Sequence, residues 1–167
     1  MTEPRLPPSS ESAEAAVLGS LLLDEQNMPY VASLRPEDFS RDQNAEIFKA
    51  CLKLWRAGKA VDQVTIAHEL AEQGELEQVG GVGYLLHLLS AAPTPLHIEH
   101  YAAIVTNLSS RRRLITAGGE IARLGYEEED IGKSIAQARG FLNRLQGHQN
   151  GRGRPQDLAE AMVRMCE

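Results

Sequence analysis

One stretch of the sequence, residues 97–124, decides the fold that we predict, and it reads HIEHYAAIVTNLSSRRRLITAGGEIARL. Apolar side chains recur in it every three or four residues, which is the period of one face of an α-helix. They are Ile98, Tyr101, Ala102, Val105, Leu108 and Ile115. A helix from His97 to Leu124 would be about 40 Å long, which exceeds what the diameter of a small domain needs. The stretch therefore predicts a helix that protrudes from a compact domain.

A second long helix is predicted directly after the first. The acidic stretch YEEED, residues 126–130, indicates a turn, and its carboxylates favour a helix start through the helix dipole. The next apolar stripe consists of Ile131, Ile135, Ala138, Phe141, Leu142 and Leu145. Two long helices joined by a short turn form an antiparallel hairpin. Because its apolar faces are long, we expect the hairpin to associate with a second copy.

Shorter helices are predicted on the N-terminal side of the hairpin, and strand signals are scarce. Residues 12–24 form an amphipathic pattern in which Gly19 indicates close packing, and residues 26–34 predict a short helix followed by a turn. The clearest stripe consists of Ile47, Ala50, Cys51, Leu54 and Trp55. Asp62 is a natural N-cap for a helix that stops at Gly74. The predicted fold is all-α, with a compact multi-helix head followed by a long antiparallel helical hairpin.

We divide the chain at changes in composition. Residues 1–11 contain closely spaced prolines and predict an extended arm. Residues 12–95 form the predicted head and residues 96–147 the predicted hairpin. Residues 148–167 read as a flexible linker and a helical stub.

Composition and charge exclude several classes of protein. The 167 residues are 43% hydrophobic and 24% charged, which is typical of a globular chain. A net charge of −6 weighs against a surface that clasps DNA, although a local basic patch stays compatible with it. Cys51 and Cys166 show no metal or redox spacing, and Cys51 is expected in the core. Without a signal peptide or an apolar run of about 18 residues, we expect a cytoplasmic protein that does not enter a membrane.

No residue set predicts catalysis, a cofactor or a metal in this chain. The glycines of VGGVGYLL, residues 79–86, lack the lysine and the strand of a phosphate-binding loop and predict a turn instead. His97 and His100 share a helix face but lack a third zinc ligand, and His68 and His87 are predicted to be partly buried. We therefore expect no catalytic, cofactor-binding or metal-binding residue.

The arginine triplet, Arg111, Arg112 and Arg113, has two interpretations. Successive residues of a helix lie about 100° apart, so the three side chains fan over roughly 200° and cannot address one phosphate strand. They are either a solvated helix surface or a charged surface for a partner. Gly118 and Gly119 remove side chains at a place where another helix could approach, at some cost in helix propensity.

The sequence resembles the N-terminal domain of bacterial replicative DNA helicases of the DnaB type, from Pro7 to about Leu145. The order and spacing of its motifs carry the resemblance. They are Pro7-Pro8, AVLGSLL at 16–22, PEDF at 36–39, Gly74-Glu75-Leu76, Val79-Gly80-Gly81 and Tyr84-Leu85.

The chain departs from the pattern of that family at two places. Ser12-Ala13-Glu14-Ala15 stands where the family often has Glu-Ala-Glu-Gln, and Asp42-Gln43-Asn44 stands where it usually has Pro-x-His. We interpret the departures as signs of a divergent or phage-like member and as changes that bear on partner surfaces.

The resemblance implies a function without catalysis in this chain. Hairpins of two copies would pair, three such dimers would form a collar, and the collar would dock primase and a helicase loader. ATP and Mg²⁺ would belong to a motor domain that follows residue 167, and this chain would bind nucleic acid weakly or not at all. The expected association and docking residues are Leu108, Ile115, Gly118, Gly119, Ile131, Ile135, Ala138, Phe141 and Leu142, with Arg111, Arg112 and Arg113 as a charged partner surface.

An alternative function remains open at this point. The same head and hairpin could form a stand-alone DNA-binding or regulatory adaptor that uses the arginine triplet, Arg123 and the GRGR stretch at 151–154. It predicts salt-sensitive binding to single-stranded DNA, whereas the helicase-domain hypothesis predicts little or none.

Overall fold

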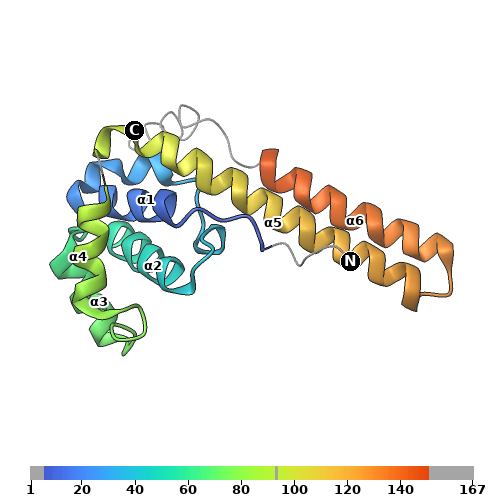
Figure 1. The fold of residues 1–167 in the computed structure, drawn as a ribbon, viewed down its shortest axis with the longest axis horizontal. Coiled ribbons are helices and arrows are strands. Elements are labelled where there is room, and N and C mark those ends of the chain that lie inside the picture. The colour runs from blue at the N-terminus through green and yellow to red at the C-terminus, as the bar shows by residue number, and fades with distance from the viewer. Residues whose placement is uncertain (1–5, 93, 151–167) are drawn as a thin grey trace. The chain divides into compact units, whose positions relative to one another are not determined.

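The computed structural model describes residues 6–92 and 94–150, with side chains up to Gln146. Helices and loops account for this part of the chain, and none of the described residues forms a strand, which confirms the all-α prediction (Figure 1). The structure divides into two compact units. One is Ser9–Ser109, called the head below, and the other contains residues 6–8 and 110–150, called the hairpin unit.

The helices follow one another with short connections. Their bounds are α1 Glu11–Leu23, η1 Glu25–Val31, η2 Pro36–Asp38, α2 Asp42–Arg56, α3 Gln63–Glu72, α4 Gly81–Ala91, η3 Pro95–His97, α5 Ile98–Glu127 and α6 Ile131–Asn150. The segments η1, η2 and η3 are 3-10 helices. The short helix predicted at 26–34 is therefore a 3-10 helix, Glu25–Val31, and Pro29 lies inside it.

Local signals in the sequence set several helix ends. The Asp62 side chain accepts hydrogen bonds from the backbone N–H groups of Val64 and Thr65, both at 2.9 Å, and so caps α3 as predicted. Gly58 and Gly74 follow α2 and α3 with φ angles of +65° and +73°. These left-handed conformations end both helices where a side chain would be strained.

The core of the head lies between α1, α2, α3 and α4, where Phe39 and Phe48 pack with ring centroids 4.9 Å apart. Gly19 of α1 fits against α4 without a side chain. A Cβ atom at Gly19 would lie 2.1 Å from the carbonyl oxygen of Leu88, so the predicted close packing is confirmed. Cys51 is fully buried, as predicted, and burial raises the pKa of its thiol to about 12.

A buried polar network joins distant segments of the head. Glu14 accepts hydrogen bonds from the backbone N–H of Ser40 at 2.7 Å, from Ser40 Oγ at 2.6 Å and from Asn44 Nδ2 at 2.8 Å. Tyr84 donates its hydroxyl hydrogen to Asn44 Oδ1 at 2.7 Å. Asn44 is only 1% exposed, so its departure from the family pattern changes the interior of the head. Our prediction that this departure bears on a partner surface is wrong at Asn44.

The first third of α5 belongs to the head. Ile98, Ala102 and Val105 are buried in the same core, and Ser109 Oγ donates to Asp38 Oδ1 at 2.6 Å. The head therefore continues to Ser109, beyond the boundary placed between residues 95 and 96. The composition of the sequence changes at Pro95, but the apolar side chains in the first three turns of α5 still pack in the core of the head.

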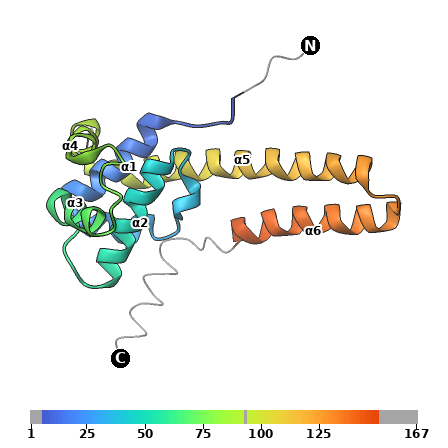
Figure 2. The same ribbon diagram turned by 90° about the horizontal axis from the view of Figure 1, so that it is seen from below.

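The hairpin unit contains the rest of α5 and α6, which run side by side in opposite directions (Figures 1 and 2). Asp130 ends the turn, and its carboxylate accepts from the backbone N–H of Gly132 at 2.8 Å. The helix α6 continues to Asn150, three residues beyond the predicted end of the hairpin. The helical stub predicted at 158–167, and the linker from residue 151, lie outside the described residues.

Candidate functional site on the helical hairpin

The seam between α5 and α6 is narrow and buries few large side chains. Ala117 and Leu124 of α5 are 7% and 8% exposed, and Ser134 of α6 is 8% exposed. Phe141 and Leu145 are half-buried beside them. One apolar edge of α6 therefore packs against α5, as its sequence pattern predicts.

The other edge of α6 is uncovered in the single chain. Ile131, Ile135 and Leu142 are 72%, 50% and 45% exposed. Burying an aliphatic side chain of this size contributes roughly 1.5–3 kcal/mol, so three exposed ones on one helix leave a substantial driving force unused. These three residues belong to the predicted association surface.

The back of α5 carries small and apolar residues with nothing packed on them. A Cβ atom added at Gly118 or Gly119 would meet no other atom within 4 Å among the described residues. Ile115 is 59% exposed, and Tyr126 at the end of the helix is 92% exposed. The glycines are thus not needed for packing within the hairpin and leave room for another helix.

The structure separates the three arginines, as their fan around the helix predicts. Arg111 is exposed. Arg112 Nη1 donates to the carbonyl oxygen of Pro8 at 2.8 Å and so ties the N-terminal arm to α5. Arg113 lines a groove between α5 and α6. They therefore do not form one patch for a phosphate strand.

The groove has an apolar floor, a charged rim and a volume of about 370 Å³. It is lined by Arg113, Thr116, Ala117, Glu120, Phe141, Arg144 and Leu145. The Arg144 guanidinium lies 4.7 Å from the centre of the Phe141 ring, within the range of a cation–π interaction.

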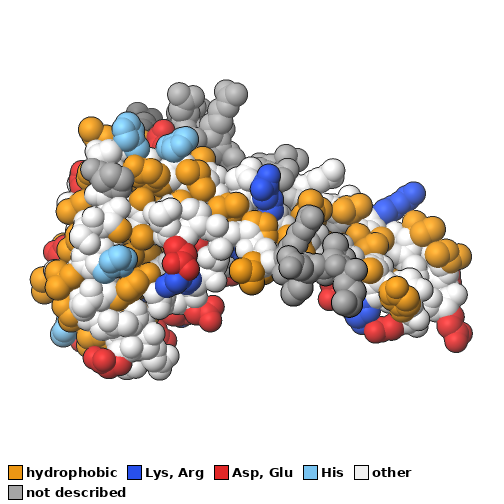
Figure 3. Space-filling model, viewed as in Figure 1, with side chains coloured by type: hydrophobic (Ala, Val, Ile, Leu, Met, Phe, Trp, Pro, Cys, Tyr) orange, Lys and Arg blue, Asp and Glu red, His pale blue; other side chains and the backbone are white. Residues whose placement is uncertain are grey.

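An apolar face lies on the other side of the hairpin from this groove. At 100° per residue, Leu114 and Ile121 lie about 140–160° around α5 from Thr116, which lines the groove. On α6, the exposed side chains of Ile131, Ile135 and Leu142 lie about 140–180° around the helix axis from Arg144, which also lines the groove. We call this surface the apolar face, and it consists of Leu114, Ile121, Ile131, Ile135 and Leu142. Hydrophobic side chains also recur along the hairpin on the surface that Figure 3 shows.

The remaining predicted residues lie at the margins of these surfaces. Leu108 is half-buried in the head, and Ala138 is half-buried on α6. Sequence reasoning missed Leu114, which is 57% exposed, and Tyr126. The period of α5 places Leu114 beside Ile115, but it does not tell which side of α5 faces α6.

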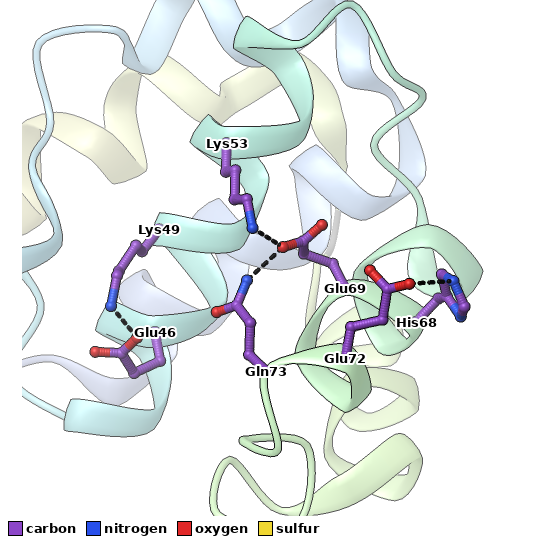
Figure 4. Close-up of polar contacts among 7 residues, drawn as sticks. All are labelled: Glu46, Lys49, Lys53, His68, Glu69, Glu72 and Gln73. Atoms are coloured by element: carbon purple, nitrogen blue, oxygen red, sulfur yellow. Dashed lines mark hydrogen bonds and ion pairs between the residues drawn. The ribbon is translucent and has the colours of Figure 1, made fainter.

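The polar contacts on α2 and α3 support the fold and form no reactive site (Figure 4). The buried Glu69 carboxylate binds Lys53 and Gln73, and the hydrogen bond from Lys53 is the main cause that lowers the pKa of Glu69. His68 Nε2 lies 3.2 Å from Glu72 Oε1 with most of its side chain in solvent. His87 is exposed as well, so the prediction that these two histidines are partly buried is wrong: both lie on the outer faces of their helices.

The glycine-rich stretch and the histidines at the start of α5 were the remaining candidate sites. Gly80 precedes α4 with a φ angle of +99°, so the glycine-rich stretch forms the predicted turn. His97 and His100 are exposed at the start of α5. In residues 6–92 and 94–150, no group of three or more His, Cys, Asp or Glu side chains is placed to hold a metal ion. None of the helices in the same ranges is long and apolar enough to cross a membrane.

Comparisons with known proteins agree with this architecture. The sequence model of the DnaB-like helicase N terminal domain matches residues 6–107. The chain is 46% identical to the replicative DNA helicase DnaB of Geobacillus stearothermophilus over 127 residues, which are 75% of this chain and 28% of that protein. The chain thus spans little more than a quarter of the length of this relative.

Solved structures match both in fold and in sequence. The crystal structure of the N-terminal domain of DnaB helicase from Mycobacterium tuberculosis superposes with a TM-score of 0.80 at 34% identity, over 83% of this chain and 99% of that one. A DnaB-like replicative helicase, described with its interactions with primase, gives a TM-score of 0.69 at 28% identity, over 81% of this chain and 31% of that one. The chain therefore belongs to the DnaB-like helicase N-terminal domain family.

Proposed function

We propose that this chain is the assembly and partner-docking domain of a hexameric replicative DNA helicase that acts in the cytoplasm during DNA replication. The relative from Geobacillus stearothermophilus is a replicative DNA helicase, and the match covers 28% of its length. Nucleotide binding with Mg²⁺, and duplex unwinding, would then belong to a motor domain outside these residues. The hairpin would hold two subunits together in a dimer, and three such dimers would form the hexamer.

The exposed apolar face is the observation that carries the association part of this proposal. Ile131, Ile135 and Leu142 remain 45–72% exposed in the single chain, because the contact between α5 and α6 does not cover them. A second copy would remove these side chains from water.

Association can be tested with two matched substitutions on α6. Ile135→Asp places a charge on the apolar face, whereas Ala136→Asp places the same charge at an exposed position about 100° further around the same helix, outside that face. Sedimentation equilibrium should show a dimer for the wild type and Ala136→Asp, and a monomer for Ile135→Asp. A wild type that stays monomeric at high micromolar concentration would refute the proposed association.

Docking of primase, with a helicase loader as a further partner, is the second part of the proposal. The structure of a related DnaB-like helicase is described with its interactions with primase. The groove rimmed by Arg113 and Arg144 lies on the other side of the hairpin from the apolar face, so association would leave it accessible. Arg144→Glu should weaken binding of a bacterial primase without changing dimerisation, and the control Arg56→Glu should change neither. Equal primase binding by all three proteins would exclude the groove.

A stand-alone adaptor that binds DNA remains the competing function. Residues 110–119 and 134–146 contain five arginines and no acidic residue, which favours it. This adaptor would bind a single-stranded oligonucleotide with an affinity that falls steeply as salt is added. Fluorescence anisotropy at two salt concentrations distinguishes the two functions, because a helicase assembly domain should bind the oligonucleotide weakly or not at all.

A further inference from the structure

The head contains a pocket that neither the proposed association nor the proposed docking groove uses. It lies between the end of α2 and the helix α3 and has a volume of about 290 Å³. This volume is just below the range of about 300–1,000 Å³ that is usual for small-molecule sites, so the pocket suits a single side chain. Its walls include the apolar Leu54 and Val64 and the polar Lys59, His68, Glu69 and Glu72.

Glu69 gives the pocket a nearly buried carboxylate with one oxygen unused. The residue is only 6% exposed, and Lys53 and Gln73 both donate hydrogen bonds to its Oε1 (Figure 4). Its Oε2 accepts no hydrogen bond from a described residue. This oxygen is not sealed off, since Glu75 Oε2 is the only enclosed side-chain oxygen without a partner in the described part of the chain. The hydrogen bond from Lys53 lowers the pKa of Glu69, so the pocket wall contains an ionised acceptor.

A second carboxylate follows one turn later on the same helix. Glu72 Oε1 lies 3.2 Å from His68 Nε2, and most of the Glu72 side chain is in solvent. Against these two carboxylates, Lys59 on the loop after α2 contributes one positive charge to the lining and is exposed. While His68 is neutral, the lining is therefore more negative than positive.

The head as a whole is strongly acidic. Residues 9–109 contain 14 Asp and Glu against 6 Lys and Arg, a formal charge of −8, whereas the whole chain has a charge of −6. Such a field attracts positively charged partners and opposes negatively charged ones. The charge of the head thus favours the same kind of ligand as the lining of the pocket.

An arginine side chain has the chemistry that this pocket requires. Its guanidinium group keeps its charge, is more weakly hydrated than an ammonium group, and presents five N–H donors in a planar fork that binds carboxylates through paired hydrogen bonds. Its methylene groups would cover Leu54 and Val64, and Val64 is 73% exposed in the single chain. A phosphate group would instead be repelled by Glu69 and Glu72.

A neighbouring hollow indicates that the arginine belongs to a polypeptide segment. This hollow also has a volume of about 290 Å³, and its lining includes Trp55, Pro29 and Glu25. Lys59 lines both hollows, so they lie next to each other. The half-buried Trp55 ring and Pro29 offer apolar surface to the residues that flank the arginine in a bound segment.

We propose that the pocket beside Glu69 binds an arginine side chain of a partner protein, with the guanidinium group on Glu69 and Glu72 and the flanking residues across Lys59 toward Trp55. The head would then have a docking site of its own, in addition to the surfaces that the proposed function assigns to the hairpin.

Two synthetic peptides test the ligand chemistry. One is acetyl-Gly-Leu-Arg-Leu-Gly-amide, and the other has citrulline in place of arginine, which keeps nearly the same shape without the charge. Isothermal titration calorimetry with the 167-residue chain should give a dissociation constant at least about tenfold lower for the arginine peptide. The fluorescence of Trp55, the single tryptophan of the chain, should change as that peptide binds.

Three variants test the position of the site. Glu69→Gln should raise the dissociation constant of the arginine peptide at least about tenfold. Lys59→Glu should lower it about threefold, because a negative charge replaces a positive one at the rim, and a folding defect would not produce such a gain. The control Glu46→Gln neutralises a carboxylate that binds Lys49 at 2.8 Å outside the pocket and should change nothing. Circular dichroism checks the folding of each variant.

Several outcomes would overturn the inference. Equal affinity for the two peptides, or unchanged binding after both Glu69→Gln and Lys59→Glu, would exclude an arginine beside Glu69. If the arginine peptide does not bind and Lys59→Glu weakens binding of a single-stranded oligonucleotide, the pocket serves nucleic acid instead. None of these measurements requires dimerisation, so a monomeric chain that binds the arginine peptide would refute the proposed association and leave this inference standing.

Discussion

The head and the hairpin unit bury their apolar residues to very different extents. In the head, fully buried side chains such as Phe48, Leu18 and Met28 form one core, and the carboxylate of Glu14 has hydrogen-bond partners. In the hairpin unit, few residues are buried, while Ile131 and Ile115 are 72% and 59% exposed. The head therefore buries its own apolar side chains, and the exposed ones of the hairpin support the proposal that a second copy covers them.

The largest expected effect concerns Gly19, which lies in the core of the head. Gly19→Ala places a Cβ atom 2.1 Å from the carbonyl oxygen of Leu88, and backbone cannot move aside cheaply. We expect a loss of roughly 3 kcal/mol in the free energy of unfolding, measured by urea denaturation. A loss below about 1 kcal/mol would mean that α1 and α4 pack less tightly than the structure shows.

The buried network of the head predicts the next largest effect. Glu14→Gln replaces one acceptor oxygen by a donor and removes the charge, so Ser40 and Asn44 can no longer both be satisfied. We expect a loss of about 2 kcal/mol in the free energy of unfolding. The control Glu11→Gln, on the same helix, removes only a surface ion pair with Arg41 and should cost less than about 1 kcal/mol. Equal losses would show that the network contributes nothing.

For Gly118 in the hairpin, we expect substitution by alanine to raise the free energy of unfolding and not to lower it. Gly118→Ala adds a methyl group that meets nothing within 4 Å, and alanine favours a helix. At concentrations where the chain is monomeric, we expect a gain of about 0.5–1 kcal/mol in the free energy of unfolding. The same variant should dimerise more weakly, because the methyl group would stand between two α5 helices. A more stable protein with unchanged dimerisation would place the second copy elsewhere.

The smallest effect concerns the ion pair of Lys53 and Glu69, and it depends on pH. The pKa of Glu69 is lowered in the folded chain, chiefly by the hydrogen bond from Lys53, so this contribution is present above the ordinary pKa of glutamate. It is lost as pH falls through the lowered folded value. The difference in melting temperature between wild type and Lys53→Met should therefore shrink as pH falls from 7 to 3. A difference that stays constant would exclude the ion pair as its cause.

Local patterns predicted the helices well but not the contacts between distant residues. The apolar period of residues 97–124 and the N-cap at Asp62 depend on neighbours in the sequence, so they could be recognised there. The hydrogen bonds from Asn44 to Glu14 and from Ser109 to Asp38 join residues 30 and 71 positions apart, and no local pattern encodes them. The burial of His68 was mispredicted for a similar reason, since its helix α3 packs with another face.

The predicted association surface was only partly determined by the sequence. The stripe on α6 contains both Phe141, which lines the groove beside α5, and Ile135, which stays exposed, and periodicity cannot separate the two. The different environments of Arg111, Arg112 and Arg113 likewise follow from where α6 and the N-terminal arm lie.

The central claim is that the head is complete in one copy, whereas the hairpin is completed by a second copy. Hydrogen exchange followed by mass spectrometry at low and high protein concentration tests it most directly. We predict that amides of residues 113–146 become more protected at high concentration, while amides of α1 to α4 keep the same protection. Protection of the hairpin that is independent of concentration would contradict the claim.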